Sequence, residues 1–190
     1  MNDRNAPDPT FGALILAGGR SSRMGADKAG LPYRGSTLLE HMKNIAQGLG
    51  PARVLVGGGP QGDLPDPVAG RGPAASLVAL AGGTAGPVRW LIIPVDMPLL
   101  TPPLLQRLLA AGPEGAFFAA HPLPFALSMD SAARAVLQRV GDGLAQGQSI
   151  SVRLILAQIG ARALTPSPGE LGQLVNANTP DEWDEIARGA

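Results

Sequence analysis

The sequence predicts a single α/β domain with a mainly parallel sheet that is covered by helices on both faces. Three observations lead to this prediction. Short apolar runs alternate along the chain with segments whose apolar residues have helical spacing. The 190 residues suit one domain, and no internal repeat or long linker divides them. Because 45% of the residues are hydrophobic and only 4% are aromatic, the core must be aliphatic. We expect residues 1–10 to be a disordered tail and residues 11–190 to form the domain.

The first half of the chain supplies three predicted strands and two predicted helices. The apolar run Phe11–Ala17 stops at two glycines, as a buried strand entering a loop would. Either Ser36 or Thr37 can cap a helix that runs to about Leu49. The remaining elements are a strand, a helix and the strongest strand signal in the chain, at residues 53–56, 74–80 and 88–95 respectively.

The second half of the chain adds helices and two shorter strands. Thr101 is expected to cap a helix with Pro102 at its first position, where proline sacrifices no helical hydrogen bond. The strands Phe117–Ala120 and Phe125–Ser128 flank a proline-stiffened turn in which we expect His121 to be structural. Two helices follow at Ser131–Val140 and Ser149–Ile159, and a capping box at residues 179–182 begins the last helix.

The composition excludes several classes of protein. The 15 basic and 15 acidic residues give zero formal net charge, so nothing attracts the chain generally to nucleic acid or to an anionic membrane. Any phosphate binding must therefore come from a local site. The absence of cysteine removes disulfides, thiolate metal sites and cysteine nucleophiles. The polar start of the chain lacks the apolar run of a signal peptide, and no apolar stretch is long enough to span a bilayer, so we expect a soluble, cytoplasmic protein.

The strongest signal for a functional site is the glycine-rich segment that follows the first strand. Glycines allow backbone N–H groups to turn inward and form a nest for phosphate oxygens. Arg23 and Lys28 add two positive charges to the same stretch. Only one other lysine, Lys43, occurs in this arginine-rich chain, which indicates that position 28 requires a compact ammonium group. The alternative is an ordinary strand-to-helix turn with basic residues on the surface. The residues whose backbone would hold the phosphates are Leu16, Ala17, Gly18 and Gly19.

A second candidate site follows the strongest predicted strand. Asp96 comes at its carboxyl end, where open α/β sheets bind their ligands. A carboxylate at that position can hold Mg²⁺ together with the phosphate oxygens of a nucleotide. The alternative is an aspartate that caps the loop before Thr101.

A third candidate lies near the end of the chain, in the segment that contains Asn176 and Asn178. If this segment is a strand, both amides face the same surface and offer donors and acceptors to a ligand. The alternative, which explains Asn178 by itself, is a strand end followed by an Asn-Thr helix cap.

The segment Leu-Ala-Gly-Gly-x-Ser-x-Arg-Met-Gly-x-Asp-Lys at residues 16–28 strongly resembles the loop of the molybdenum cofactor guanylyltransferases, the MobA family. The resemblance implies a Rossmann-like three-layer α/β/α domain that transfers GMP from GTP to molybdopterin and releases pyrophosphate. It implies that Arg23, Lys28 and Asp96 are catalytic, that Asp96 holds Mg²⁺, and that Asn176 and Asn178 bind the molybdopterin. Molybdoenzymes or their chaperones would receive the product.

The middle of the chain resembles the family less closely. Gly72 and the residues after it occupy the place of the family's loop beside the guanine base, and Asp66 corresponds to its nucleotide-contacting aspartate, although Asp63 is a competing assignment. The chain has glycines at 57–59 where the family often has asparagine, and Ala74 and Ser76 replace leucine and glycine. The alternatives that stay open are transfer from CTP, a sugar phosphate as acceptor, and a nucleotide-binding module without turnover.

Overall fold

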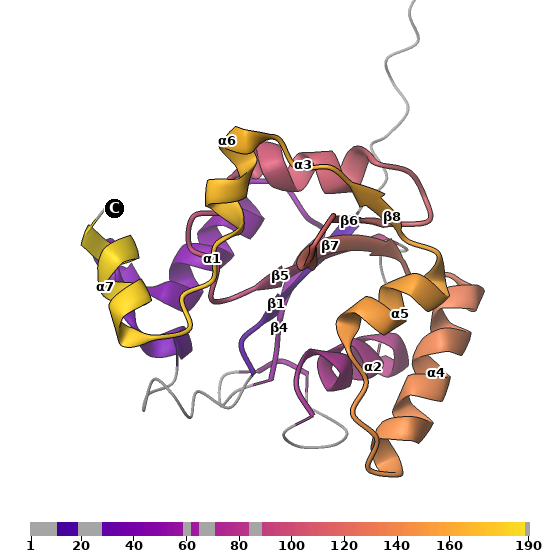
Figure 1. Ribbon diagram of the computed structural model, residues 1–190. Helices are drawn as coiled ribbons and strands as arrows, with labels where there is room; N and C mark the ends of the chain where they lie inside the picture. Colours follow the sequence, from indigo (N-terminus) through magenta and orange to yellow (C-terminus); the bar gives the residue numbers. More distant parts are fainter. Residues whose placement is uncertain (1–10, 19–27, 59–61, 65–70, 84–88, 189–190) are drawn as a thin grey trace, which may run out of the picture.

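The computed structural model describes residues 11–18, 28–58, 62–64, 71–83 and 89–188. Its centre is a six-stranded sheet with the strand order β4-β1-β5-β7-β6-β8 (Figure 1). The strands β4, β1 and β5 are parallel, β7 is antiparallel to both β5 and β6, and β8 is parallel to β6. The strands are β1 (Phe11–Leu16), β4 (Arg53–Gly57), β5 (Arg89–Pro94), β6 (Ala116–Phe118), β7 (His121–Ser128) and β8 (Arg162–Leu164). The predicted mainly parallel α/β fold is confirmed.

Helices cover both faces of the sheet (Figure 1). One face carries α1 (Leu38–Gln47), α3 (Pro102–Ala110), the short α6 (Pro168–Leu171) and α7 (Pro180–Arg188). The other face carries α2 (Pro73–Gly83), α4 (Ser131–Ala145) and α5 (Val152–Ile159). Smaller elements complete the described chain: the hairpin strands β2 (Pro32–Tyr33) and β3 (Ser36–Thr37) and the 3₁₀ turns η1 (Lys28–Gly30) and η2 (Gly172–Leu174).

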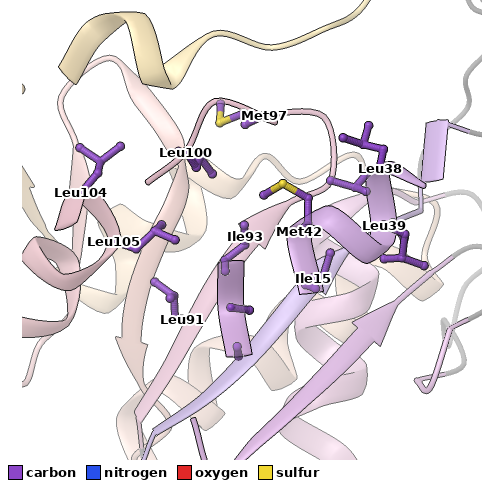
Figure 2. Packing of buried hydrophobic residues seen from close by; sticks show 14 of the residues in the cluster. Ile15, Leu38, Leu39, Met42, Leu91, Ile93, Met97, Leu100, Leu104 and Leu105 are labelled. Atoms are coloured by element: carbon purple, nitrogen blue, oxygen red, sulfur yellow. The ribbon is translucent and has the colours of Figure 1, made fainter. Parts of the chain in front are cut away.

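Alternating residues of the central strands supply two aliphatic cores. Ile15, Leu91 and Ile93 point toward α1 and α3, where Figure 2 shows them among leucines of both helices and Met42 of α1. Their neighbours Leu14 and Ile92 point to the opposite face and pack with α2, α4 and α5. Because both faces are buried, these strands are continuous apolar runs. Each buried aliphatic side chain stabilises the fold by roughly 1.5–3 kcal/mol.

The turn between β6 and β7 lies earlier than the sequence predicts. The chain reverses at Ala119 and Ala120, and β7 already begins at His121, which pairs with Phe118. Pairing with β5 starts only at Phe125. The two prolines of this segment therefore lie where β7 has no ladder bond to β5, so their missing N–H groups do not interrupt that pairing.

The starts of three helices agree only partly with the prediction. The hydroxyl of Thr37 accepts a hydrogen bond from Glu40 N and begins α1, as one of the two predicted caps. Thr101 precedes α3, but its hydroxyl donates to Gln173 Oε1 over 2.6 Å and does not cap the helix. The helix α5 begins after Ser151, whose hydroxyl accepts from Leu154 N, so residues 149–151 lie outside it.

The segment 175–178 is extended coil and contains no strand, which corrects the predicted geometry of the two asparagines. The expected tail at residues 1–10 lies outside the described residues. Within the described part of the chain, no helix combines the length and apolar character needed to cross a bilayer.

Candidate active site

Backbone hydrogen bonds join four segments at the carboxyl ends of the parallel strands. Gly57 O, at the end of β4, accepts from both Ala17 N at 2.9 Å and Gly18 N at 3.2 Å. Val95 N donates to Leu16 O at 3.1 Å. The C-terminal segment joins them because Ala177 N donates to Asp96 O at 2.9 Å. The ends of β4, β1 and β5 and the chain before α7 therefore meet at the edge of the sheet where α/β proteins bind ligands.

A charged cluster occupies this edge. Lys28 Nζ lies 3.1 Å from Asp96 Oδ2 and 3.0 Å from Asn178 Oδ1. The side chains of Lys28 and Asp96 are only 14% and 21% exposed. The buried side chain of Ala29 anchors η1, the turn in which Lys28 is the first residue. Three residues separated by up to 150 positions in the sequence thus form one hydrogen-bonded group.

The cluster lines a cavity of about 250 Å³. Most of the predicted site residues that the structure describes line it: Leu16, Ala17, Gly18, Lys28, Asp96, Asn176 and Asn178. The sequence analysis missed four further lining residues, which are Pro73, Pro94, Val95 and Leu123. The sequence pattern predicts a turn at Leu123, whereas this residue belongs to the N-terminal part of β7 and reaches the cavity from there.

Four predicted site residues remain. Gly19, Arg23 and Asp66 lie outside the described residues. Gly72 has a positive φ of 67° and directly precedes the lining residue Pro73, but it lines a separate hollow. A positive φ favours glycine, so the backbone geometry explains why this position has no side chain.

Asp63, the competitor of Asp66, has a structural role. Its carboxylate accepts a hydrogen bond from Val56 N at 2.8 Å, and its own N–H donates to Val56 O at 2.8 Å. Asp63 therefore closes the loop after β4 onto the end of that strand.

The asparagine segment is held by the first turn of α7. Glu182 Oε2 accepts from Asn178 N at 2.8 Å and from Thr179 N at 3.0 Å, while Glu182 N donates to Thr179 Oγ1 at 3.3 Å. The predicted capping box is thus present. The bond from Asn178 N is the largest of the effects that lower the pKa of the Glu182 carboxyl. Both asparagines line the cavity even though the segment is not a strand.

The donors at this site fit a divalent cation that brings other ligands with it. Asp96 supplies a carboxylate, but the described residues contain no group of three or more His, Cys, Asp or Glu side chains that could enclose a metal. Mg²⁺ commonly binds through one or two carboxylates and completes its coordination with water and phosphate oxygens. The site therefore suits a metal that arrives with a phosphorylated ligand.

Two of the positions that depart from the resembled pattern lie in contact. A Cβ added to Gly57 would lie 2.9 Å from Ser76 Cβ and 3.2 Å from Leu14 Cδ1. The side chain of Ser76 is only 2% exposed. Glycine at 57 thus makes room for serine at 76, and the two positions belong to one packing arrangement between β4 and α2.

Comparison with known proteins identifies the family. Residues 13–151 match the model of the MobA-like NTP transferase domain. The chain belongs to this family. It is 35% identical over 176 residues to the molybdenum cofactor guanylyltransferase of Xanthomonas euvesicatoria, and this match covers 91% of the chain and 92% of the relative. The family model and this relative together show that the protein is a nucleotidyltransferase.

Solved structures support the same fold. A nucleotidyl transferase from Methanothermobacter thermautotrophicus superposes with a TM-score of 0.68 at 19% identity, covering 95% of this chain and 97% of that one. A Mycobacterium tuberculosis protein solved in complex with manganese superposes with a TM-score of 0.59 at 20% identity, covering 95% and 100% of the two chains. At these identities the likeness concerns the MobA-like fold alone.

Proposed function

We propose that this protein transfers GMP from GTP to molybdopterin, releasing pyrophosphate and forming the guanine dinucleotide form of the molybdenum cofactor. The 35% identity to a molybdenum cofactor guanylyltransferase over 92% of that relative supports the proposal. We further propose that residues 11–190 act as one nucleotidyltransferase domain in the cytoplasm and that molybdoenzymes or their chaperones receive the product.

The convergence of Lys28, Asp96 and Asn178 at one cavity is the observation that carries the proposal. In the reaction, a phosphate oxygen of the acceptor attacks the α-phosphorus of GTP in line with the bond to the β-phosphate. The new O–P bond forms as that bond breaks, and the electron pair leaves with pyrophosphate. No covalent protein intermediate is required, so catalysis rests on positioning and on charge stabilisation.

Each part of the site has a role in this scheme. Lys28, together with Arg23, stabilises the negative charge of the phosphates. The amides of Asn176 and Asn178 orient the molybdopterin through donors and acceptors on the same side chain. The residues proposed to contact the nucleotide are Leu16, Ala17, Gly18, Gly19, Lys28, Asp66, Gly72 and Asp96.

Asp96 is the residue proposed to hold Mg²⁺. Its carboxylate lines the cavity and already binds one cation, the ammonium of Lys28, at 3.1 Å. A bound Mg²⁺ would neutralise charge on the triphosphate and on the departing pyrophosphate. The manganese complex of the structurally similar Mycobacterium tuberculosis protein is consistent with a divalent ion in this fold.

The test is an assay of pyrophosphate release with molybdopterin, Mg²⁺ and each of GTP, CTP, ATP and UTP. We expect release with GTP, only when the acceptor is present, and loss of release when the divalent metal is chelated. Lys28→Ala should lower kcat by about 10²–10³ if the ammonium stabilises charge in the transition state. Lys43→Ala is the matched control because Lys43, the only other lysine, forms an exposed pair with Glu40 on α1.

The same assay separates the competing functions. A preference for CTP would overturn the guanylyl assignment, and the altered packing at Gly57 and Ser76 is the observation that keeps this candidate in view. Release with a sugar phosphate in place of molybdopterin would change the acceptor. Binding of GTP without pyrophosphate release, in the presence of acceptor and metal, would indicate a module without turnover.

A further inference from the structure

The first turn of α7 is connected to the catalytic cluster through Asn178. The N–H groups of Asn178 and Thr179 both donate to Glu182 Oε2, at 2.8 and 3.0 Å. These N–H groups belong to the two peptide planes on either side of the Asn178 Cα. A single carboxylate oxygen therefore constrains the backbone torsions of Asn178 and sets the direction of its Cβ. Only the side-chain torsions remain to place the amide.

The amide placed in this way holds Lys28. Asn178 Oδ1 accepts from Lys28 Nζ at 3.0 Å, beside the bond from the same ammonium to Asp96. The two acceptors differ in kind, because one is charged and is the proposed metal ligand, whereas the other is neutral. If another cation binds the Asp96 carboxylate, Asn178 Oδ1 is the one of these two acceptors that still holds the Lys28 ammonium.

The other end of this connection is fixed in the core. Trp183 and Ile186 of α7 are each only 8% exposed, and the Trp183 ring lies 5.6 Å from the ring of Tyr33. Figure 1 shows α7 beside α1 at the edge of the molecule. A carboxylate in the first turn of a helix also interacts favourably with the helix dipole. Glu182 is thus held by a packed helix and does not depend on Asn178 for its own position.

We propose that Glu182 is a positioning residue that holds the Lys28 ammonium, through Asn178, at the cavity where the nucleotide phosphates bind. This inference deepens the proposed function, on which the role of the ammonium rests. Glu182 itself touches no reacting group, and its effect is to restrict where the ammonium lies.

The chain offers a direct measurement of this restraint because it has only two lysines. A low dose of an amine-reactive N-hydroxysuccinimide ester, followed by peptide mass spectrometry, gives the ratio of Lys28 to Lys43 labelling within the same molecule. Lys43 is the internal reference because its ammonium pairs with Glu40 within the same helix, α1. We expect Glu182→Ala to raise the ratio about tenfold, as the loss of a hydrogen bond to a charged group would.

Three further variants make the experiment specific, each checked for helix content by circular dichroism. Asp181→Ala removes a neighbouring carboxylate from the same helical turn and should leave the ratio unchanged. Glu182→Gln keeps an oxygen acceptor but loses the charge, and should retain the wild-type ratio. In an Asn178→Ala background, which already lacks the amide, Glu182→Ala should add no further increase.

An unchanged ratio in folded Glu182→Ala would overturn the inference. A raised ratio in Glu182→Gln would also overturn it, since charge and not hydrogen bonding would then restrain the lysine. The glutamine variant still tests the inference if the alanine variant unfolds. A further increase in the Asn178→Ala background would show that Glu182 does not act through Asn178. The labelling uses no substrate, so failure of GMP transfer and failure of the positioning role are observed separately.

Discussion

Replacing Gly57 by alanine should destabilise the protein and disturb the start of the glycine-rich loop. The new Cβ would lie 2.9 Å from Ser76 Cβ, 3.1 Å from Ser76 Oγ and 3.2 Å from Leu14 Cδ1. The first of these contacts involves the Cβ atom next to the backbone of α2, so rotation of the serine side chain cannot relieve it. Either α2 or the end of β4 must move.

The size of the effect follows from the packing. Forcing one extra methyl group into a packed core typically costs about 1–3 kcal/mol. Ser76→Gly removes the two serine atoms that would clash, and by itself costs about 0.5 kcal/mol in helix propensity because glycine is less favourable than serine within a helix. The double variant should therefore be nearly as stable as Ser76→Gly alone. The expected coupling free energy between the two positions is about 1–2 kcal/mol.

Urea denaturation of the wild type, both single variants and the double variant measures this coupling. Gly82→Ala is the matched control, because the same methyl group is added within α2 but no atom lies within 4 Å of it. It should stabilise the protein by about 0.4–1 kcal/mol by restricting the unfolded chain. Strictly additive effects of Gly57→Ala and Ser76→Gly would refute the packing argument.

Activity should respond to the same change. Gly57 O accepts the N–H groups of Ala17 and Gly18, which line the cavity. A shift of β4 at this residue therefore moves the backbone proposed to hold the nucleotide. We expect Gly57→Ala to raise the KM for GTP, and Ser76→Gly to restore it in the double variant.

Three further predictions concern stability. The hydrogen bond from Arg107, followed by that from Ser167 N, lowers the pKa of Glu170 from 4.5 to about 2. The contribution of the Arg107–Glu170 pair to stability is therefore present above pH 4.5 and is lost as the pH falls toward 2. The stability difference between wild type and Arg107→Ala, at most about 1 kcal/mol for a surface pair, should be present at pH 6 and nearly absent at pH 2 in denaturation curves. Trp183→Ala should cost about 3–5 kcal/mol in urea denaturation, because it empties a buried site under α7. Gly12→Ala should lower the melting temperature, since its Cβ would lie 2.6 Å from the Trp90 ring; unchanged melting would contradict the observed packing.

The sequence predicted best those elements whose local pattern agrees with their tertiary environment. β1 and β5 are apolar throughout because both of their faces are buried, so they were recognisable without knowledge of their neighbours. The capping box of α7 is a local arrangement within four residues and was also correctly predicted.

Features that depend on distant partners could not be predicted. His121 and the prolines after it resemble a turn locally, but they extend β7 beyond its pairing with β5. Thr101 has the sequence context of a helix cap, yet its hydroxyl binds Gln173, a residue 72 positions away. The asparagine segment reaches the cavity because Ala177 N donates a hydrogen bond to Asp96 O. No periodicity in the sequence predicts that bond.

For the candidate site, the sequence indicated the residues but not their geometry. The position of Asp96 after a strong strand, and of Lys28 after a glycine-rich loop, suggested a shared pocket. Their separation of 3.1 Å and the joint contact with Asn178 could come only from the structure. The sequence does not predict that Leu123 lines the cavity, because an apolar residue between two prolines has no chemical feature that indicates a binding site.

The backbone bonds that tie together the ends of β1, β4 and β5 and the segment before α7 have a practical consequence for engineering. They use peptide groups only, so replacing a polar side chain at the cavity leaves this frame in place. Lys28, Asp96 and the two asparagines can therefore be exchanged while the backbone frame of the cavity stays in place, and the effects of each change should stay within this side-chain cluster. The same independence makes the cavity a suitable starting point for redesigning which acceptor the protein binds.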